Sequence, residues 1–384
     1  MIVPMATTDR QRDRAMSLPR LGHLEALDGI RGLAVAIVVL HHLRVPGING
    51  GWLGVDLFFA LSGFLITVSV LGMGEGTGLG AFWRRRGWRI GPAMAVLLAW
   101  YLAWWLLFDV EGHDGPMRLR WLLASAGQVL NVHDAGSLHG PFSDYLGHLW
   151  SLSAEAQFYV AWPILLTVLL RTRASKVAVV GVAVALLVAS SAERTWLAVA
   201  DMQWNRLYYG PDTRSTALWA GCVVGLAAAW GAFDRCPALR RAARLLTLPS
   251  AVALAVLVAL PSMNFSVERT PYVWGLTVIG LSAGALVAAG AAVRGGPLRL
   301  LLEARPLAWL GRISYSVYLW HVPLIAQLHR ARPEMDTVGR VAIVVPAALL
   351  AGWLSYVVVE RPLLSAAGRA RLRGRLSRRQ TPVG

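Results

Sequence analysis

The stretch Leu24–Leu43, LEALDGIRGLAVAIVVLHHL, decides how the chain folds. Its apolar part is close to the roughly 20 residues that a helix needs to cross a bilayer. It nevertheless carries Asp28, Arg31 and two adjacent histidines, and no small-residue cleavage site follows it. A secretory signal peptide has an uninterrupted apolar centre and such a cleavage site. We therefore expect a retained first membrane span.

The rest of the chain repeats this apolar character. Of its 384 residues 56% are hydrophobic and only 15% are charged, with a mean hydropathy of +0.52, whereas soluble domains carry about 25% charged residues. The sequence therefore predicts an all-α protein, a polytopic transmembrane helical bundle with about ten spans. The expected spans lie near Leu27–Leu43, Trp52–Leu71, Arg89–Phe108, His148–Leu170, Lys176–Ser191, Ser215–Trp230, Leu245–Pro261, Tyr272–Val293, Leu307–Leu328 and Val341–Val358.

The positive charge predicts the orientation of the bundle. The formal net charge of +16 gathers in short loops and tails rather than on an aromatic-interleaved surface, which argues against nucleic-acid binding. If the N-terminus is inside, 25 of the 37 basic residues fall in the expected cytoplasmic segments. Because cytoplasmic loops retain positive charge, we expect both termini to be cytoplasmic.

The other chemistry-bearing residues of the chain indicate neither a disulfide nor a metal site. Cys222 lies in an expected span and Cys236 in the loop after it, so a structural disulfide is not expected. The longest expected outer loop, residues 109–147, is rich in aspartate and histidine, but the spacing matches no compact zinc pattern, so we expect no metal.

Arg31 and His42 stand out within the first span. They are eleven residues apart, so at about 100° per residue they share one helix face, separated by roughly 16 Å along the axis. Ionisable groups inside a membrane normally face the bundle interior or a wet cavity, which makes the pair a functional candidate. Alternatively, Arg31 snorkels to headgroups and His42 makes a structural hydrogen bond. These two residues alone leave both interpretations open.

Six further sequence blocks complete a pattern with the first span. They are GVDLFFALSGFLIT (54–67), FWRRRGWRIGP (82–92), HLWSLSAEAQFYVAWP (148–163), DTRSTALWAG (212–221), LGRISYSVYLWHVP (310–323) and YVVVERP (356–362). In this order they resemble the membrane-bound acyltransferase 3 family, whose hallmark is an arginine, ten intervening residues and a histidine. Arg31 and His42 fit that spacing. No stretch resembles the SGNH-type esterase-like domain fused to some members, so a second acyl-handling site is not expected.

The resemblance implies a multipass O-acyltransferase of the cell membrane. Such an enzyme moves an acetyl or other short acyl group from acyl-CoA to a hydroxyl of a sugar, glycan or glycosylated metabolite. Its domain would cover residues 24–363, between a basic cytoplasmic tail over 1–23 and a basic, disordered cytoplasmic tail over 364–384. The competing interpretation is a secondary transporter or exporter with a buried Arg/His pair. Transporters commonly consist of related halves, but Arg31 and His42 have no counterpart in the second half.

The catalytic candidates follow from the chemistry of acyl transfer. A hydroxyl nucleophile needs a base, and neutral imidazole accepts protons near neutral pH, so we expect His42 to be the general base. The resemblance implies the same residue. Either Glu155 or Asp56 is expected to orient its imidazole, as a carboxylate does in a catalytic triad. Tyr318 and His321, on the ninth span, are expected to pack helices rather than to catalyse.

Binding residues are predicted on both sides of His42. Arg86 and Arg89 lie three apart at the expected inner mouth of the third span, and with Arg31 they are predicted to hold the phosphates of acyl-CoA. The simpler account of these arginines is positive-inside charge. On the acceptor side, His148 is predicted to line the substrate site or to make a structural hydrogen bond. Arg214 is predicted to contact substrate or to pair with Asp212.

Overall fold

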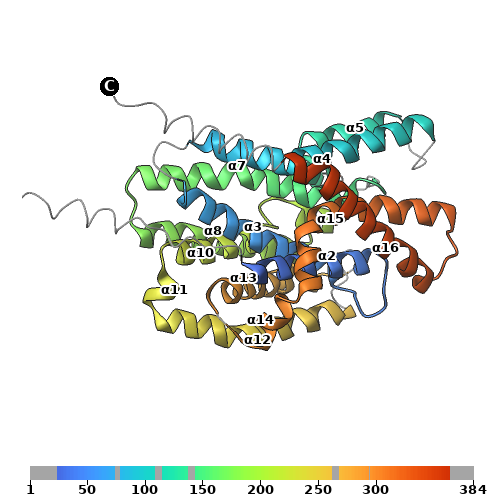
Figure 1. Ribbon diagram of the computed structural model, residues 1–384. Coiled ribbons are helices and arrows are strands. Elements are labelled where there is room, and N and C mark those ends of the chain that lie inside the picture. The colour runs from blue at the N-terminus through green and yellow to red at the C-terminus, as the bar shows by residue number, and fades with distance from the viewer. Residues whose placement is uncertain are drawn as a thin grey trace, which may run out of the picture.

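The computed structural model describes residues 24–73, 78–108, 115–136, 143–261, 268–293 and 295–363. Every regular element within these ranges is a helix (Figure 1), so the predicted all-α class is confirmed. The two predicted tails, 1–23 and 364–384, lie outside the described residues. The same holds for five acidic or histidine residues of the 109–147 loop, namely Asp109, Glu111, His113, Asp114 and His139.

Each of the ten expected spans overlaps one helix of the structure. Seven described helical segments are individually long and apolar enough to cross a membrane, which makes the chain a multipass membrane protein. The other three expected spans correspond to α10, which is shorter, and to the more polar α2 and α15. The ten helices are α2 (Glu25–His42), α3 (Gly54–Leu71), α4 (Leu79–Leu107), α7 (Trp150–Arg171), α8 (Lys176–Val199), α10 (Thr216–Ala229), α12 (Pro237–Ala259), α13 (Leu276–Ala292), α15 (Arg305–Ala331) and α16 (Thr337–Ser355).

Three of these helices extend well beyond the predicted apolar windows. α4 begins ten residues before the predicted start at Arg89, α12 begins eight residues before Leu245, and α8 continues eight residues past Ser191. The extra turns carry arginines or a Glu-Arg pair, which lower local hydropathy without interrupting helical backbone hydrogen bonding. Apolar windows therefore locate the membrane-embedded part of such a helix but not its ends.

The interior of the bundle is built from α3, α10, α13 and the pair α2 and α15. α3 and α13 are mostly buried, whereas α4, α8, α12 and α16 expose most of their apolar windows. Figure 1 shows α12 along one edge, α4 and α5 along the opposite edge, and α15 beside α2. Because the exposed residues of the outer helices are apolar, they suit contact with lipid rather than water.

Close helix contacts hold this interior together. A Cβ atom at Gly311 of α15 would overlap the backbone carbonyl of Asp28 on α2, and one at Gly221 of α10 would overlap that of Ala60 on α3. Small residues that let membrane helices approach closely increase their van der Waals contact, which drives helix association in lipid. The glycines therefore fix the distance between the helices that carry the predicted site residues.

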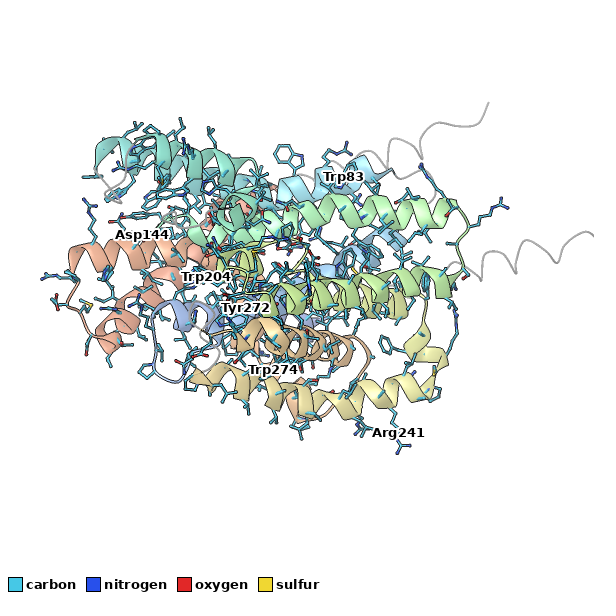
Figure 2. All side chains as sticks on the ribbon, turned by 180° about the vertical axis from the view of Figure 1, so that it is seen from behind. Trp83, Asp144, Trp204, Arg241, Tyr272 and Trp274 are labelled. Carbon is cyan, nitrogen blue, oxygen red and sulfur yellow. The ribbon has the colours of Figure 1, made fainter. Side chains whose placement is uncertain are left out.

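Short helices connect the spans at the two ends of the bundle. They are α5 (Gly115–Ala126), α6 (Leu130–Gly136), α9 (Trp204–Tyr209), α11 (Ala232–Arg235) and α14 (Pro297–Leu302). Figure 2 shows Asp144, from the predicted outer loop, and Arg241, from a predicted inner segment, toward opposite ends of the molecule. The alternation of loops that the charge distribution predicted is therefore compatible with the helix arrangement.

Candidate active site

The three arginines predicted to bind the donor line one pocket. Arg31 comes from α2, and Arg86 and Arg89 from α4, where Arg86 and Arg89 lie inside the long helix rather than at its start. The empty space of this arginine pocket, its open mouth included, is about 740 Å³. The rest of the lining comes from α3, α4, α7 and α15 and mixes aromatic, apolar and polar groups: Val55, Phe58, Phe59, Leu61, Ser62, Ile90, Ser151, Leu152, Glu155, Tyr159, Ser314, Tyr315 and Tyr318.

Local contacts hold the charged groups of the arginine pocket in place. Arg31 Nη1 donates to Asp28 Oδ1 at 3.2 Å. The Arg86 guanidinium carbon lies 5.1 Å from the centre of the Tyr159 ring, within the range of a cation–π contact. Glu155 accepts hydrogen bonds from the hydroxyls of Ser62 and Tyr159. Glu155 therefore belongs to the wall of the arginine pocket.

His42, at the end of α2, contacts a second histidine instead of a carboxylate. Its Nδ1 lies 3.1 Å from Nε2 of His321 on α15, and the two ring centres are 5.0 Å apart. Within the described chain neither Asp56 nor Glu155 contacts the His42 ring. The expectation that one of these carboxylates orients His42 is thus corrected by the geometry, which gives the orienting contact to His321.

The hydrogen bonds determine which nitrogen of His42 is free to act as a base. His321 Nδ1 lies 2.6 Å from the backbone carbonyl of Tyr318 and must donate to it, because a carbonyl only accepts. In a neutral imidazole the other nitrogen, His321 Nε2, then accepts, so His42 Nδ1 carries the proton that it shares with His321. This leaves the lone pair on Nε2 of His42, the tautomer that a general base needs.

His148 and Tyr318 connect the arginine pocket to this histidine pair. The Tyr318 hydroxyl lines the arginine pocket, donates to the His148 backbone carbonyl at 2.8 Å and lies 2.7 Å from Ser151 Oγ. The Tyr318 and His148 rings each lie 5.3 Å from the His321 ring. His148 Nε2 donates to the Leu319 carbonyl at 3.1 Å, which is the structural hydrogen bond expected as its alternative role. Tyr318 and His321 thus form the partition between the arginine pocket and His42.

On the other side of this partition, His42 opens into a second cavity. The histidine pocket is lined by residues from the end of α2, from α15, from α16 and from the segment before α7: His42, Leu43, Arg44, Asp144, Tyr145, Val322, Ile325, Ala326, Leu328, His329, Arg330, Arg340 and Val344. Its empty space, mouth included, is about 1390 Å³. It lies at the end of the bundle that holds Asp144 in Figure 2. His42 therefore faces a space that is separate from the arginine pocket.

Asp56 and Arg214 form a buried ion pair elsewhere in the bundle. Two guanidinium nitrogens of Arg214 donate to the two Asp56 oxygens at 2.8 and 3.0 Å, and both side chains are almost inaccessible. The Arg214 guanidinium also lies 4.8 Å from the Tyr208 ring centre. The alternative pairing of Arg214 with Asp212 is wrong, because Asp212 instead accepts from Arg206 at 2.5 and 2.8 Å. Asp56 thus neutralises Arg214 and is not a partner of His42.

Arg206 and Asp212 form a neighbouring ion pair, in which each charge stabilises the other. Partial burial raises the pKa of Asp212, but hydrogen bonds from Arg206 and from the Thr213 backbone N–H lower it more, so the net pKa lies below the ordinary value. A carboxylate held ionised in this way suits an ion pair just before the start of α10 rather than proton transfer. Among the described residues no group of three or more His, Cys, Asp or Glu side chains is placed to hold a metal ion.

His321 is a site residue that was predicted from the sequence to pack helices rather than to take part in catalysis. A histidine inside an expected span is a functional candidate by default, and Tyr318 and His321 are three apart and so share a helix face. Its position inside an expected span was therefore the sequence feature that could have identified His321 as a site residue. The partner of His321 could not be read from the sequence, because His42 lies 279 positions away.

The bundle and its two pockets define a class of protein, a polytopic membrane protein with ionisable side chains directed into internal cavities. Comparison with known proteins specifies the class further. The model of the acyltransferase 3 family, described as an acyltransferase domain, matches residues 24–358. The chain therefore belongs to the acyltransferase 3 family.

Curated relatives agree with this family membership. A Bacillus subtilis relative, YrhL, is 32% identical over 361 residues, which cover 89% of this chain and 55% of that protein. The peptidoglycan O-acetyltransferase OatA of Listeria monocytogenes is 30% identical over 357 residues, which cover 89% of this chain and 56% of that protein. The O-acetyltransferase OatA of Staphylococcus aureus is 29% identical over 377 residues, which cover 94% of this chain and 60% of that protein. The chain thus spans little more than half the length of these relatives. No solved structure matches the chain.

Proposed function

We propose that this protein is an O-acyltransferase rather than a transporter, and that it moves an acetyl group from acetyl-CoA to a hydroxyl of a glycan or glycosylated molecule, with His42 as the general base. The observation that carries the proposal is the hydrogen-bonded pair of His42 and His321, which leaves Nε2 of His42 unprotonated beside a large pocket. The names of the Listeria and Staphylococcus relatives support an acetyl group, and the Listeria name also supports a glycan acceptor.

The arginine pocket is the proposed donor site. Three guanidinium groups in one cavity suit the phosphates of CoA, because each guanidinium can form two parallel hydrogen bonds to phosphate oxygens. The pocket extends to Tyr318, whose ring lies 5.3 Å from that of His321. The roughly 16 Å rise from Arg31 to His42 along α2 is compatible with an extended pantetheine arm. For direct transfer the donor arm would have to pass the partition formed by Tyr318 and His321, so that the thioester carbon lies beside His42.

The proposed chemistry is a direct transfer. The acceptor hydroxyl gives its proton to Nε2 of His42 while its oxygen attacks the thioester carbonyl carbon. The carbon–sulfur bond then breaks, the new ester leaves with the acetyl group, and the proton on His42 returns to the CoA thiolate. His321 Nε2 accepts the Nδ1 hydrogen bond throughout, and it stabilises the positive charge that develops on the His42 ring.

The two pockets would face opposite sides of the membrane. If both termini are cytoplasmic, as the arginine distribution predicts, Arg31 is on the inner half of α2 and His42 on the outer half. Cytosolic acetyl-CoA would then enter the arginine pocket, and the acceptor would enter the histidine pocket from outside. Reporter fusions to the C-terminus that signal only in the periplasm or only in the cytoplasm test this orientation, and a periplasmic signal would contradict it.

The central test compares two adjacent histidines. Detergent-purified protein receives radiolabelled acetyl-CoA and a panel of sugars and glycosides. His42→Ala should lower turnover by about 10² to 10⁴, the usual contribution of a general base. His41→Ala is the matched control, because His41 also lies at the end of α2 but donates to the Ile48 carbonyl rather than to His321. Unchanged turnover in His42→Ala would reject the mechanism.

A further inference from the structure

The histidine pocket carries an excess of positive charge. Its lining includes three guanidinium groups, those of Arg44, Arg330 and Arg340, against the single carboxylate of Asp144. Its cavity volume of about 560 Å³ lies within the roughly 300–1,000 Å³ that is usual for a small-molecule site. Arg330 already has an interaction of its own, so Arg44 and Arg340 are the cations available to a ligand. Two cations favour a ligand with negative charge over a neutral sugar.

If both termini are cytoplasmic, as predicted, the positions of these arginines are not explained by the membrane. Positive charge is favoured on the cytoplasmic side, but this pocket lies at the end of the bundle opposite Arg241 (Figure 2). Arg330 lies in the last turn of α15, where a cation complements the helix dipole. Arg340 lies at the end of the first turn of α16, where that dipole opposes a cation. Neither topology nor the helix dipole therefore accounts for Arg340.

Arg340 also has unused hydrogen-bonding capacity. One of its terminal nitrogens donates to the Pro333 carbonyl at 3.3 Å, while its Nε is buried and has no hydrogen-bond partner among the described residues. A buried donor without a partner is unfavourable. A carboxylate or phosphate oxygen in the pocket would accept hydrogen bonds from the terminal nitrogens of this guanidinium, which are not buried in this way.

Arg44 occupies a backbone position that glycine usually takes. Its φ is +57°, and the turn that ends α2 has the two hydrogen bonds of a Schellman motif, from Arg44 N–H to the His41 carbonyl at 2.8 Å and from Val45 N–H to the Leu40 carbonyl at 3.1 Å. Glycine at this position would keep the turn and relieve its steric cost. The side chain of Arg44 can therefore be removed without disturbing the backbone beside His42.

The chain offers a matched position at the end of α7. Arg173 also has a φ of +57°, and its turn has the same two hydrogen bonds, from Arg173 N–H to the Leu170 carbonyl at 3.2 Å and from Ala174 N–H to the Leu169 carbonyl at 3.0 Å. Arg173 is exposed and is not part of the histidine pocket. The same arginine-to-glycine substitution there changes charge and backbone strain equally but leaves the pocket intact.

We infer that the histidine pocket selects an anionic acceptor: Arg44 and Arg340 bind a carboxylate or phosphate of the saccharide and so place one of its hydroxyls at His42. The guanidinium fork matches both anions. Because the acceptor hydroxyl is the one that His42 deprotonates, this inference rests on the proposed function. It adds the chemical class of the acceptor, which the family membership leaves open.

Transfer to matched acceptors tests the selection. The purified protein receives labelled acetyl-CoA with methyl glucoside, methyl glucuronide or methyl glucoside phosphate, which separate the neutral, carboxylate and phosphate cases. Wild-type protein should show a KM roughly ten-fold or more lower for at least one anionic acceptor than for the neutral one, and added salt should reduce the difference. Arg44→Gly and Arg340→Gln should each remove most of this preference, with little effect on the neutral acceptor. Arg173→Gly should change nothing.

A binding measurement separates failure of this inference from failure of the proposed function. Calorimetric titration of His42→Ala protein with the same three glycosides, without acetyl-CoA, reports binding independently of chemistry. One outcome is that wild-type protein transfers no acetyl group while the anionic glycosides still bind and Arg44→Gly weakens their binding. That result would reject the proposed function and support the anionic pocket. Equal binding of neutral and anionic glycosides, or equal weakening by Arg44→Gly and Arg173→Gly, would overturn the anionic pocket.

Discussion

Replacing His321 with phenylalanine should slow acetyl transfer without weakening the binding of either substrate. His321 is fully buried, accepts the Nδ1 proton of His42 and donates its own proton to the Tyr318 carbonyl. Phenylalanine keeps an aromatic ring of similar size between Tyr318 and His42 but cannot accept a hydrogen bond. His42 would then lose the contact that fixes its tautomer.

The size of the effect follows from the loss of one buried hydrogen bond. Leaving a buried donor without its partner costs about 1–3 kcal/mol, and about 1.4 kcal/mol corresponds to a ten-fold change in rate. We therefore expect kcat to fall roughly 5- to 150-fold in His321→Phe. Removal of the base itself in His42→Ala should cost about 10² to 10⁴. The double variant should be no slower than His42→Ala, because His321 acts through His42.

The assay is steady-state acetyl transfer in detergent, with acetyl-CoA and acceptor varied separately. His321→Gln is the conservative variant, because its amide oxygen can accept the proton from His42 Nδ1, and its kcat should recover to within a few-fold of wild type. A size-exclusion profile identical to that of wild type excludes misfolding. Wild-type kcat in His321→Phe, or equal losses in His321→Phe and His321→Gln, would refute a role for this hydrogen bond.

Other parts of the structure make further predictions. Arg86→Gln and Arg89→Gln should each raise the KM for acetyl-CoA about ten-fold and leave the KM for the acceptor unchanged; an unaltered donor KM in both would reject donor binding in the arginine pocket. Asp56→Asn should lower the melting temperature in detergent, because it leaves the buried charge of Arg214 unpaired at a cost of about 3–5 kcal/mol; wild-type stability would show that the pair is not needed. Gly311→Val should separate α2 from α15, which a fall in melting temperature together with loss of activity would reveal.

The positions of the helices could be read from the sequence because membrane burial imposes a simple rule. A segment that crosses a bilayer must be apolar over about 20 residues, and every window chosen on that basis overlaps a helix. The ends were not predictable in the same way. The start of α4, with Arg84, Arg85 and Arg86, continues a helix that the hydropathy of its residues conceals. The composition of a segment reflects whether lipid or water surrounds it, and it does not show where helical hydrogen bonding ends.

The site was predictable only where its residues belong to one local pattern. Arg86 and Arg89 are three apart on one helix, so their common face follows from helix geometry. That Arg31 joins them was suggested by its similar expected depth in the membrane, and the family resemblance supplied acyl-CoA as the donor. The pairing of Asp56 with Arg214, across 158 positions, and that of His42 with His321 depend on which helices pack together. Side-chain pairs between distant helices leave no periodic signal in a single sequence.

The partnership of α2 and α15 brings together the residues of both pockets. α2 contributes Arg31 to the arginine pocket and His42 to the histidine pocket, and α15 contributes the partition residues Tyr318 and His321. Their glycine-mediated contact near Gly311 allows almost no separation between the two backbones. A catalytic geometry built on two locked helices is held more precisely than one built on loops. The distance from the proposed donor anchor to the proposed base is thus set by helix packing, and substrates must adapt to it.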